Sequence, residues 1–168
     1  MVHSDAMDLL LVRHAIAVDH GNPLYVRDED RPLTQDGIEE FRVAARALKD
    51  RVKKPDHIVS SPLVRAQQTA EILRDALVPR AKIELCEHLA PGGDHGRVVA
   101  FVTGLGAQLA ALVGHEPHLS GLTSYLLVGN SESVSMSFKK GGAALVRFPH
   151  APAPGRGTLE WLVQPGAR

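Results

Sequence analysis

Residues 9–14 read Leu-Leu-Leu-Val-Arg-His, and this stretch decides the predicted fold. Four consecutive apolar residues indicate a short buried strand, and a run without polar alternation is typical of a parallel sheet that is covered on both faces. The strand ends in a cation beside an imidazole. Because open α/β sheets bind ligands beyond the carboxyl ends of their strands, Arg13 and His14 stand where such proteins usually perform chemistry.

The composition is that of a globular protein. A chain of 168 residues with 44% hydrophobic residues is expected to form one domain, residues 1–168, with a substantial core. The 19 basic and 19 acidic side chains balance, so charge gives no reason to expect a nucleic acid or an anionic membrane as partner. The single cysteine, Cys86, cannot form an intrachain disulfide, and no apolar run is long enough to span a membrane. We therefore expect a cytoplasmic protein.

The next segment, residues 15–33, is predicted to be a long loop, and loops of this length often carry function. Its charged run, residues 28–30, is interpreted as a solvated surface. Thr34 is a candidate helix cap. After it, apolar residues recur at steps of three and four and predict an amphipathic helix, with Ile38, Phe41, Ala45, Leu48 and Val52 on the buried face.

Two further strands are each followed closely by a basic side chain. Residues 56–60 predict a strand, and Ser61 with Pro62 is expected to begin a helix that carries Arg65 in its first turn. A cation near a helix N-terminus is unfavourable unless an anion lies between them. The apolar residues 108–113 predict another strand, which leads directly to His115.

The remaining segments are less distinctive. Residues 82–85 predict a short strand and residues 95–105 a helix, and Pro117 is expected to open another helix. Near the C-terminus, apolar residues alternate with serines over 134–138 and predict a strand that turns at 139–142 into a second strand over 144–148. A terminal strand is predicted around residues 159–163.

Parallel strands that end near residues 12, 60 and 113 would bring four basic groups to one edge of the sheet. Two guanidiniums can bind a phosphoryl group through paired hydrogen bonds, and histidine is a competent nucleophile toward phosphorus. A second imidazole, when protonated, would stabilise the charge on the transferred group. The expected site consists of Arg13, His14, Arg65 and His115.

Four blocks of sequence occur in order along the chain: Leu-Val-Arg-His-Ala at 11–15, Leu-Thr-x-x-Gly at 33–37, Ser-Ser-Pro-Leu-x-Arg-Ala-x-x-Thr-Ala at 60–70 and Val-Gly-His-Glu-Pro at 113–117. Together they resemble the histidine phosphatase superfamily, which includes the phosphoglycerate mutases. The likeness is strongest to the SixA-type phosphohistidine phosphatases, whose short chains match this one in length. The resemblance implies a phosphoglycerate mutase-like three-layer α/β sandwich, with a mostly parallel sheet flanked by helices. It also implies that His14 is the phosphorylated nucleophile and that the other three basic residues complete a phosphate pocket.

One departure from the family pattern bears on the substrate. Mutases and many phosphoester-cleaving relatives carry a Leu-x-Glu acid after the third strand, whereas this chain has Leu89-Ala90-Pro91. An alkoxide leaving group needs a general acid, but an imidazole that leaves a phosphohistidine needs less assistance once its ring is protonated. The missing acid therefore favours phosphohistidine as the substrate. Glu87 and Asp94 are the nearby candidates for an acid.

Several alternatives remain open at this stage. The loops at 15–33 and 86–97 are expected to recognise the leaving group, with His20 and His88 as candidate substrate contacts. The favoured partner is a histidine-phosphorylated phosphotransfer domain, and the alternative is a small phosphorylated molecule hydrolysed as a phosphomonoester. A phosphate-binding interaction module without catalysis is a further alternative. A metal-dependent hydrolase is disfavoured because no His-Glu-x-x-His motif is present, so we expect neither a metal nor another cofactor.

Overall fold

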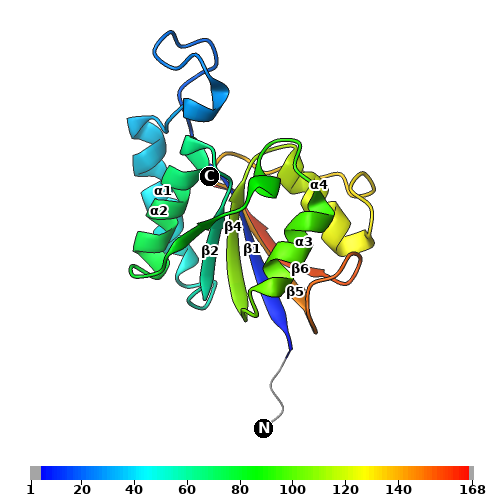
Figure 1. Ribbon diagram of the computed structural model, residues 1–168. Helices are drawn as coiled ribbons and strands as arrows, with labels where there is room; N and C mark the ends of the chain where they lie inside the picture. Colours follow the sequence, from blue (N-terminus) through cyan, green and yellow to red (C-terminus); the bar gives the residue numbers. More distant parts are fainter. Residues whose placement is uncertain (1–4, 167–168) are drawn as a thin grey trace.

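The computed structural model describes residues 5–166, and its centre is a six-stranded mixed sheet (Figure 1). The strand order is β3-β2-β4-β1-β5-β6. The first four strands in this order run parallel to one another. Strand β5 then pairs antiparallel with β1, and β6 pairs antiparallel with β5. The strands are β1 (Met7–Arg13), β2 (His57–Ser60), β3 (Ile83–Leu85), β4 (Leu109–Gly114), β5 (Ala143–Phe148) and β6 (Thr158–Val163).

Two pairs of helices cover the two faces of the sheet (Figure 1). Leu10 and Val12 of β1 pack into the core beneath one pair, whereas Leu9 and Leu11 pack into the core beneath the other. Because successive strand residues point to opposite faces, a central strand covered on both sides must be apolar throughout, which explains residues 9–12. The predicted α/β sandwich is confirmed. The helices are α1 (Gln35–Leu48) and α2 (Val64–Leu77) on one face, and α3 (His95–Gly104) and α4 (His118–Val128) on the other.

The start of α1 lies tightly against the segment that leaves β1. The Thr34 hydroxyl accepts a hydrogen bond from the Gly37 amide at 2.9 Å and so caps the helix, as predicted. The Thr34 amide donates to the Ile16 carbonyl at 3.0 Å. A side chain at Gly37 would lie 2.2 Å from that carbonyl oxygen, so the Thr-x-x-Gly block reflects a close approach of two backbones.

Two predicted elements were wrong. Residues 134–138 do not form a strand, because the neighbouring position beside β1 is occupied by β5 and the Phe138 backbone bonds to side chains instead. The helix predicted from Ser61 begins at Val64, and its N-cap residue, Leu63, makes no side-chain cap. The Ser61 hydroxyl accepts from the Leu63 amide at 3.2 Å, so it closes a turn that precedes the helix.

The sheet topology gathers the predicted site at one edge. Strands β1, β2 and β4 are mutually parallel, and their carboxyl ends are Arg13, Ser60 and Gly114. The loop over 15–33 leaves the sheet at this edge and projects beyond α1 and α2 (Figure 1). Across residues 5–166, none of the helices is both long enough and apolar enough to cross a membrane.

Candidate active site

His14 follows β1 directly and is 6% exposed. Its Nδ1 donates to the Ala15 carbonyl at 2.7 Å, so the lone pair of a neutral ring lies on Nε2. Burial lowers the pKa of His14 to about 4, against the raising effect of the Ala15 hydrogen bond, and the charges of Arg65 and Arg13 lower it further. At neutral pH the side chain is therefore an uncharged imidazole with a free Nε2, the form that a nucleophile requires.

Arg13 is fixed through the segment that precedes β5. Its Nη1 donates to the Phe138 carbonyl at 2.7 Å, while the Phe138 amide donates to the Glu116 carboxylate at 3.2 Å. Burial lowers the pKa of Arg13, opposed by the Glu116 charge, but a guanidinium remains charged at any physiological pH. Its Nε is buried without a hydrogen-bond partner. Arg13 thus lines the cavity as a cation whose Nε has no partner within the protein.

Arg65 lies in the first turn of α2 and is 4% exposed. Its Nη1 donates to the Asp28 carbonyl at 2.8 Å and its Nη2 to the Asp28 carboxylate at 3.0 Å, while its Nε has no partner. Desolvation lowers the pKa of this guanidinium, opposed by its hydrogen bonds to Asp28. The anion required beside this helix start is therefore supplied, in the structure, by the protein's own Asp28.

His115 follows β4, and its ring centroid lies 5.2 Å from that of His14. Its Nε2 lies 2.7 Å from the Ser61 hydroxyl oxygen, which also accepts from the Leu63 amide. Ser61 satisfies its own proton by donating to Nε2, so the ring proton of a neutral His115 is assigned to Nδ1, a buried atom without a partner. Burial, and then the charges of His14 and Arg65, lower the pKa of His115 to about 3. Both the lowered pKa and the Ser61 contact favour a neutral His115 with its N–H at Nδ1 in this structure.

These four side chains line one cavity of about 250 Å³. Within residues 5–166, four buried side-chain nitrogens or oxygens have no hydrogen-bond partner, and three of them belong to residues that line this cavity: Arg13 Nε, Arg65 Nε and His115 Nδ1. An unpaired buried donor costs about 1–3 kcal/mol, so three such groups on the residues around one cavity favour an acceptor-rich anion as its occupant. The cavity is lined by Arg13, His14, Ala17, Asp19, His20, Arg31, Arg65, Pro91, His115, Glu116 and Lys140.

The long loop adds residues that the sequence interpretation missed. Arg31 lines the cavity and is 7% exposed, and its Nη2 lies 2.8 Å from the Asp28 carboxylate. The charged run over 28–30 is exposed, as predicted, but the Asp28 side chain, 41% exposed, also binds Arg31 and Arg65. The three-residue spacing of Asp28 and Arg31 was the available signal, since it places both on one side of a helical turn.

Of the other residues predicted to contact the substrate or act as an acid, only one lines the cavity. His20 lines the cavity, and its Nε2 lies 3.0 Å from Arg31 Nη2. His88, Glu87 and Asp94 do not line it, and the Asp94 carboxylate instead caps α3 by accepting from the Arg97 amide at 2.9 Å. The structure therefore gives neither Glu87 nor Asp94 a place from which to protonate a leaving group. Across residues 5–166, no three histidine, cysteine or acidic side chains are grouped as a metal site would require.

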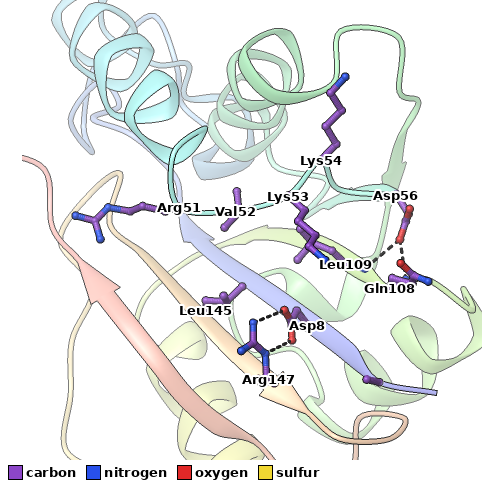
Figure 2. Close-up of a pocket in the computed structure, with 11 residues that line it drawn as sticks. Asp8, Arg51, Val52, Lys53, Lys54, Asp56, Gln108, Leu109, Leu145 and Arg147 are labelled. Atoms are coloured by element: carbon purple, nitrogen blue, oxygen red, sulfur yellow. Dashed lines mark hydrogen bonds and ion pairs between the residues drawn. The ribbon is translucent and has the colours of Figure 1, made fainter. Parts of the chain in front are cut away.

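A second cavity, of about 520 Å³, lies at the opposite edge of the sheet (Figure 2). Its acidic groups are engaged, because Asp8 pairs with Arg147 at 3.1 Å and the Asp56 carboxylate accepts from the amides of Gln108 and Leu109. None of the described residues that line it is a histidine, serine or cysteine. The larger cavity therefore lacks the combination of a buried imidazole and buried guanidiniums that lines the smaller one.

A buried neutral imidazole at the end of a parallel strand, in a cavity lined by two buried guanidiniums, is suited to phosphoryl transfer. The family model described as "Histidine phosphatase superfamily (branch 1)" matches residues 9–90. The chain belongs to the histidine phosphatase superfamily.

Individual proteins and structures show which members of the superfamily this chain is similar to. The chain is 29% identical to phosphohistidine phosphatase SixA of Escherichia coli K12 over 163 residues, which cover 95% of this chain and 94% of SixA. A structure of the protein histidine phosphatase SixA complexed with tungstate matches with a TM-score of 0.82 and 29% identity, covering 95% of this chain and 97% of that one. An uncharacterized protein of Picosynechococcus is 36% identical over 140 residues, 81% of this chain and 82% of that protein. These likenesses support phosphatase activity.

Proposed function

We propose that this protein is a metal-independent phosphohistidine phosphatase, a single domain over residues 1–168, that works through a phosphorylated His14. The observation that carries the proposal is a neutral, buried His14 with a free Nε2 beside three unpaired donors. The similarity to SixA supports the same substrate class. The proposed partner is a histidine-phosphorylated phosphotransfer domain.

In the first chemical step, the Nε2 lone pair of His14 attacks phosphorus while the P–N bond to the substrate imidazole breaks. The substrate ring reacts in the form that is protonated at its second nitrogen, with a proton taken from solvent, and so departs as neutral imidazole. Arg13, Arg65 and the Nδ1–H of His115 hold the non-bridging oxygens as charge is redistributed. In the second step, water attacks phospho-His14, which releases inorganic phosphate and restores the neutral imidazole.

The proposal favours phosphohistidine over a phosphomonoester because of which cavity-lining residues can donate a proton to the leaving group. Pro91, which stands where relatives carry an acidic residue, lines the cavity and has no proton to give. Of the carboxylates that do line it, Glu116 already accepts hydrogen bonds from Ser120 and Phe138. Asp19 is the other carboxylate that lines the cavity, and it would have to supply the proton if an alkoxide were to leave, whereas a protonated imidazole needs none.

The test compares hydrolysis of a phosphohistidine-bearing protein with that of a panel of phosphomonoesters, all in excess EDTA. We expect hydrolysis of phosphohistidine to persist in EDTA and to exceed that of every ester. Faster ester hydrolysis would instead support a phosphomonoesterase with a carboxyl acid in the cavity. Loss of activity in EDTA would contradict metal independence, and tight phosphate binding without turnover would support an interaction module.

The covalent step has its own test. Wild-type protein mixed with ³²P-labelled phosphohistidine substrate and quenched in alkali should carry label that is acid-labile and alkali-stable, as a phosphoramidate is. His14→Ala should carry no label and show no turnover, because it lacks the nucleophile, and it should still unfold cooperatively on heating. Labelling or full activity in His14→Ala would contradict the mechanism.

A further inference from the structure

The loop over 15–33 carries an exposed apolar tip, residues 24–26. Leu24 and Val26 are 80% and 90% exposed and are the two most exposed large apolar side chains within residues 5–166. A single exposed apolar residue is ordinary, but two that flank an aromatic residue, Tyr25, are a candidate contact surface. The loop that carries them projects beyond α1 and α2 (Figure 1).

The apolar tip is held in place by hydrogen bonds. The Leu24 amide donates to the Asn22 side-chain oxygen at 2.9 Å, and the Tyr25 amide donates to the Asn22 carbonyl at 3.0 Å. Two residues beyond the tip, Asp28 binds the guanidinium of Arg65. The patch is therefore presented in a defined position and is tied to the phosphate-binding arginine, which lowers the entropic cost of using it.

Residues on both sides of the apolar tip in the sequence line the active-site cavity, but the tip itself does not. Asp19 and His20 on one side of the tip, and Arg31 on the other, line the cavity, whereas residues 24–26 do not. A small phosphorylated molecule held in about 250 Å³ would leave the tip in water. Only a body larger than the cavity can place a phosphoryl group beside His14 and cover the tip as well.

We propose that the apolar tip, residues 24–26, is a docking surface for the folded protein that carries the phosphohistidine. This inference rests on the proposed function and deepens it. Between Asp19 and Arg31 the loop carries four carboxylates and two guanidiniums. The matching partner surface has an apolar patch beside its phosphohistidine and basic side chains around that patch. The same acidic surroundings oppose binding to an anionic membrane.

The test compares two substrates with the same leaving group: free phosphohistidine and a folded phosphotransfer domain phosphorylated on its histidine with phosphoramidate. In Leu24→Ser/Val26→Ser, kcat/KM for the phosphorylated domain should fall by about tenfold or more, through KM, as expected when central apolar contacts are lost. The kcat/KM for free phosphohistidine should not change. Val43→Ser removes a 65% exposed apolar side chain from α1 and should change neither rate.

Three outcomes overturn the inference. If the double variant treats the phosphorylated domain as wild type does, the tip is not a docking surface. If both substrates lose activity together, the substitutions act on the active site. If wild-type protein sediments as a dimer that the double variant dissociates, the tip binds a second copy of the chain. Should wild type hydrolyse neither substrate, the proposed function fails with it, a result distinct from these three.

Discussion

The hydroxyl of Ser61 decides what His115 can offer to a phosphoryl group. By donating to Nε2, it assigns the proton of a neutral ring to Nδ1, the unpaired donor of the cavity. A wrong tautomer would present a lone pair to a phosphoryl oxygen, which is repulsive.

We therefore expect Ser61→Ala to lower kcat/KM for phosphohistidine by roughly tenfold to a hundredfold, the range for loss of one oriented donor. Ser61→Thr, which keeps the hydroxyl, should recover most of the rate. The matched control is Ser60→Ala, because the neighbouring hydroxyl bonds to the Ser61 carbonyl and not to His115. Equal losses in Ser60→Ala and Ser61→Ala would show that both act through folding alone.

Asp28 competes with phosphate for Arg65. Its carboxylate places a negative charge 3.0 Å from Arg65 Nη2, beside the cavity that is to receive a dianion. Asp28→Asn keeps the shape and one acceptor oxygen but removes the charge. We expect it to tighten inhibition by tungstate roughly threefold to tenfold, an effect that salt should reduce.

The control for this prediction is Glu29→Gln, which makes the same charge change at a side chain that pairs with Arg27. It should leave tungstate inhibition near the wild-type value. Weaker inhibition in Asp28→Asn would indicate that Asp28 mainly orients Arg65 for the anion.

At the scale of elements, the connection between β3 and α3 brings position 91 to the cavity. The chain passes through a single 3₁₀ turn, Glu87–Leu89, and then places Pro91 at the cavity. His118 Nε2 donates to the Gly93 carbonyl at 3.1 Å and fixes this connection. A side chain at Gly93 would lie 2.0 Å from the His88 carbonyl oxygen, so the segment has little freedom to move.

Pro91→Glu should therefore restore an acid to the cavity. We expect its kcat/KM for an alkyl phosphate to rise by about tenfold or more, with a smaller change for phosphohistidine, because general acid catalysis helps only the poorer leaving group. Pro91→Gln, of the same size but without the acid, should show no such rise. Equal ester rates in the two variants would contradict the assignment of position 91 as the acid position.

At the scale of the whole molecule, the parallel strands made the site predictable from sequence. Residues 9–12 and 109–113 are apolar because both faces of their strands are buried, so the positions of His14 and His115 followed from the ends of those runs. The loop over 15–33 was not predictable in the same way. Its contacts, such as that of Asp28 with Arg65 across 37 positions, are non-local and depend on the tertiary fold. The alternation of apolar residues and serines over 134–138 predicted a strand that does not form, because the Phe138 backbone binds the side chains of Arg13 and Glu116.

Three buried histidines also link stability to pH. Burial lowers the pKa of His14 and His118 to about 4 and that of His115 to about 3, against about 6.5 in an unfolded chain. Between pH 6.5 and about 4 the unfolded chain therefore binds protons that the folded protein does not. Stability must fall as pH is lowered through this window. At pH 5, each histidine would cost on the order of 2 kcal/mol, a large part of the usual net stability.

His118 allows this linkage to be tested outside the catalytic residues. In His118→Gln, the side-chain amide can still donate to the Gly93 carbonyl, but no titratable group remains at this position. We expect Tm to fall between pH 8 and pH 5 in both proteins and to fall by several degrees less in the variant. The quantity compared is the change in Tm between pH 8 and pH 5 within each protein, so a lower Tm of His118→Gln at pH 8 does not affect the result. An identical fall in both would mean that His118 is protonated in the folded state by pH 5, and that its burial does not exclude the charge.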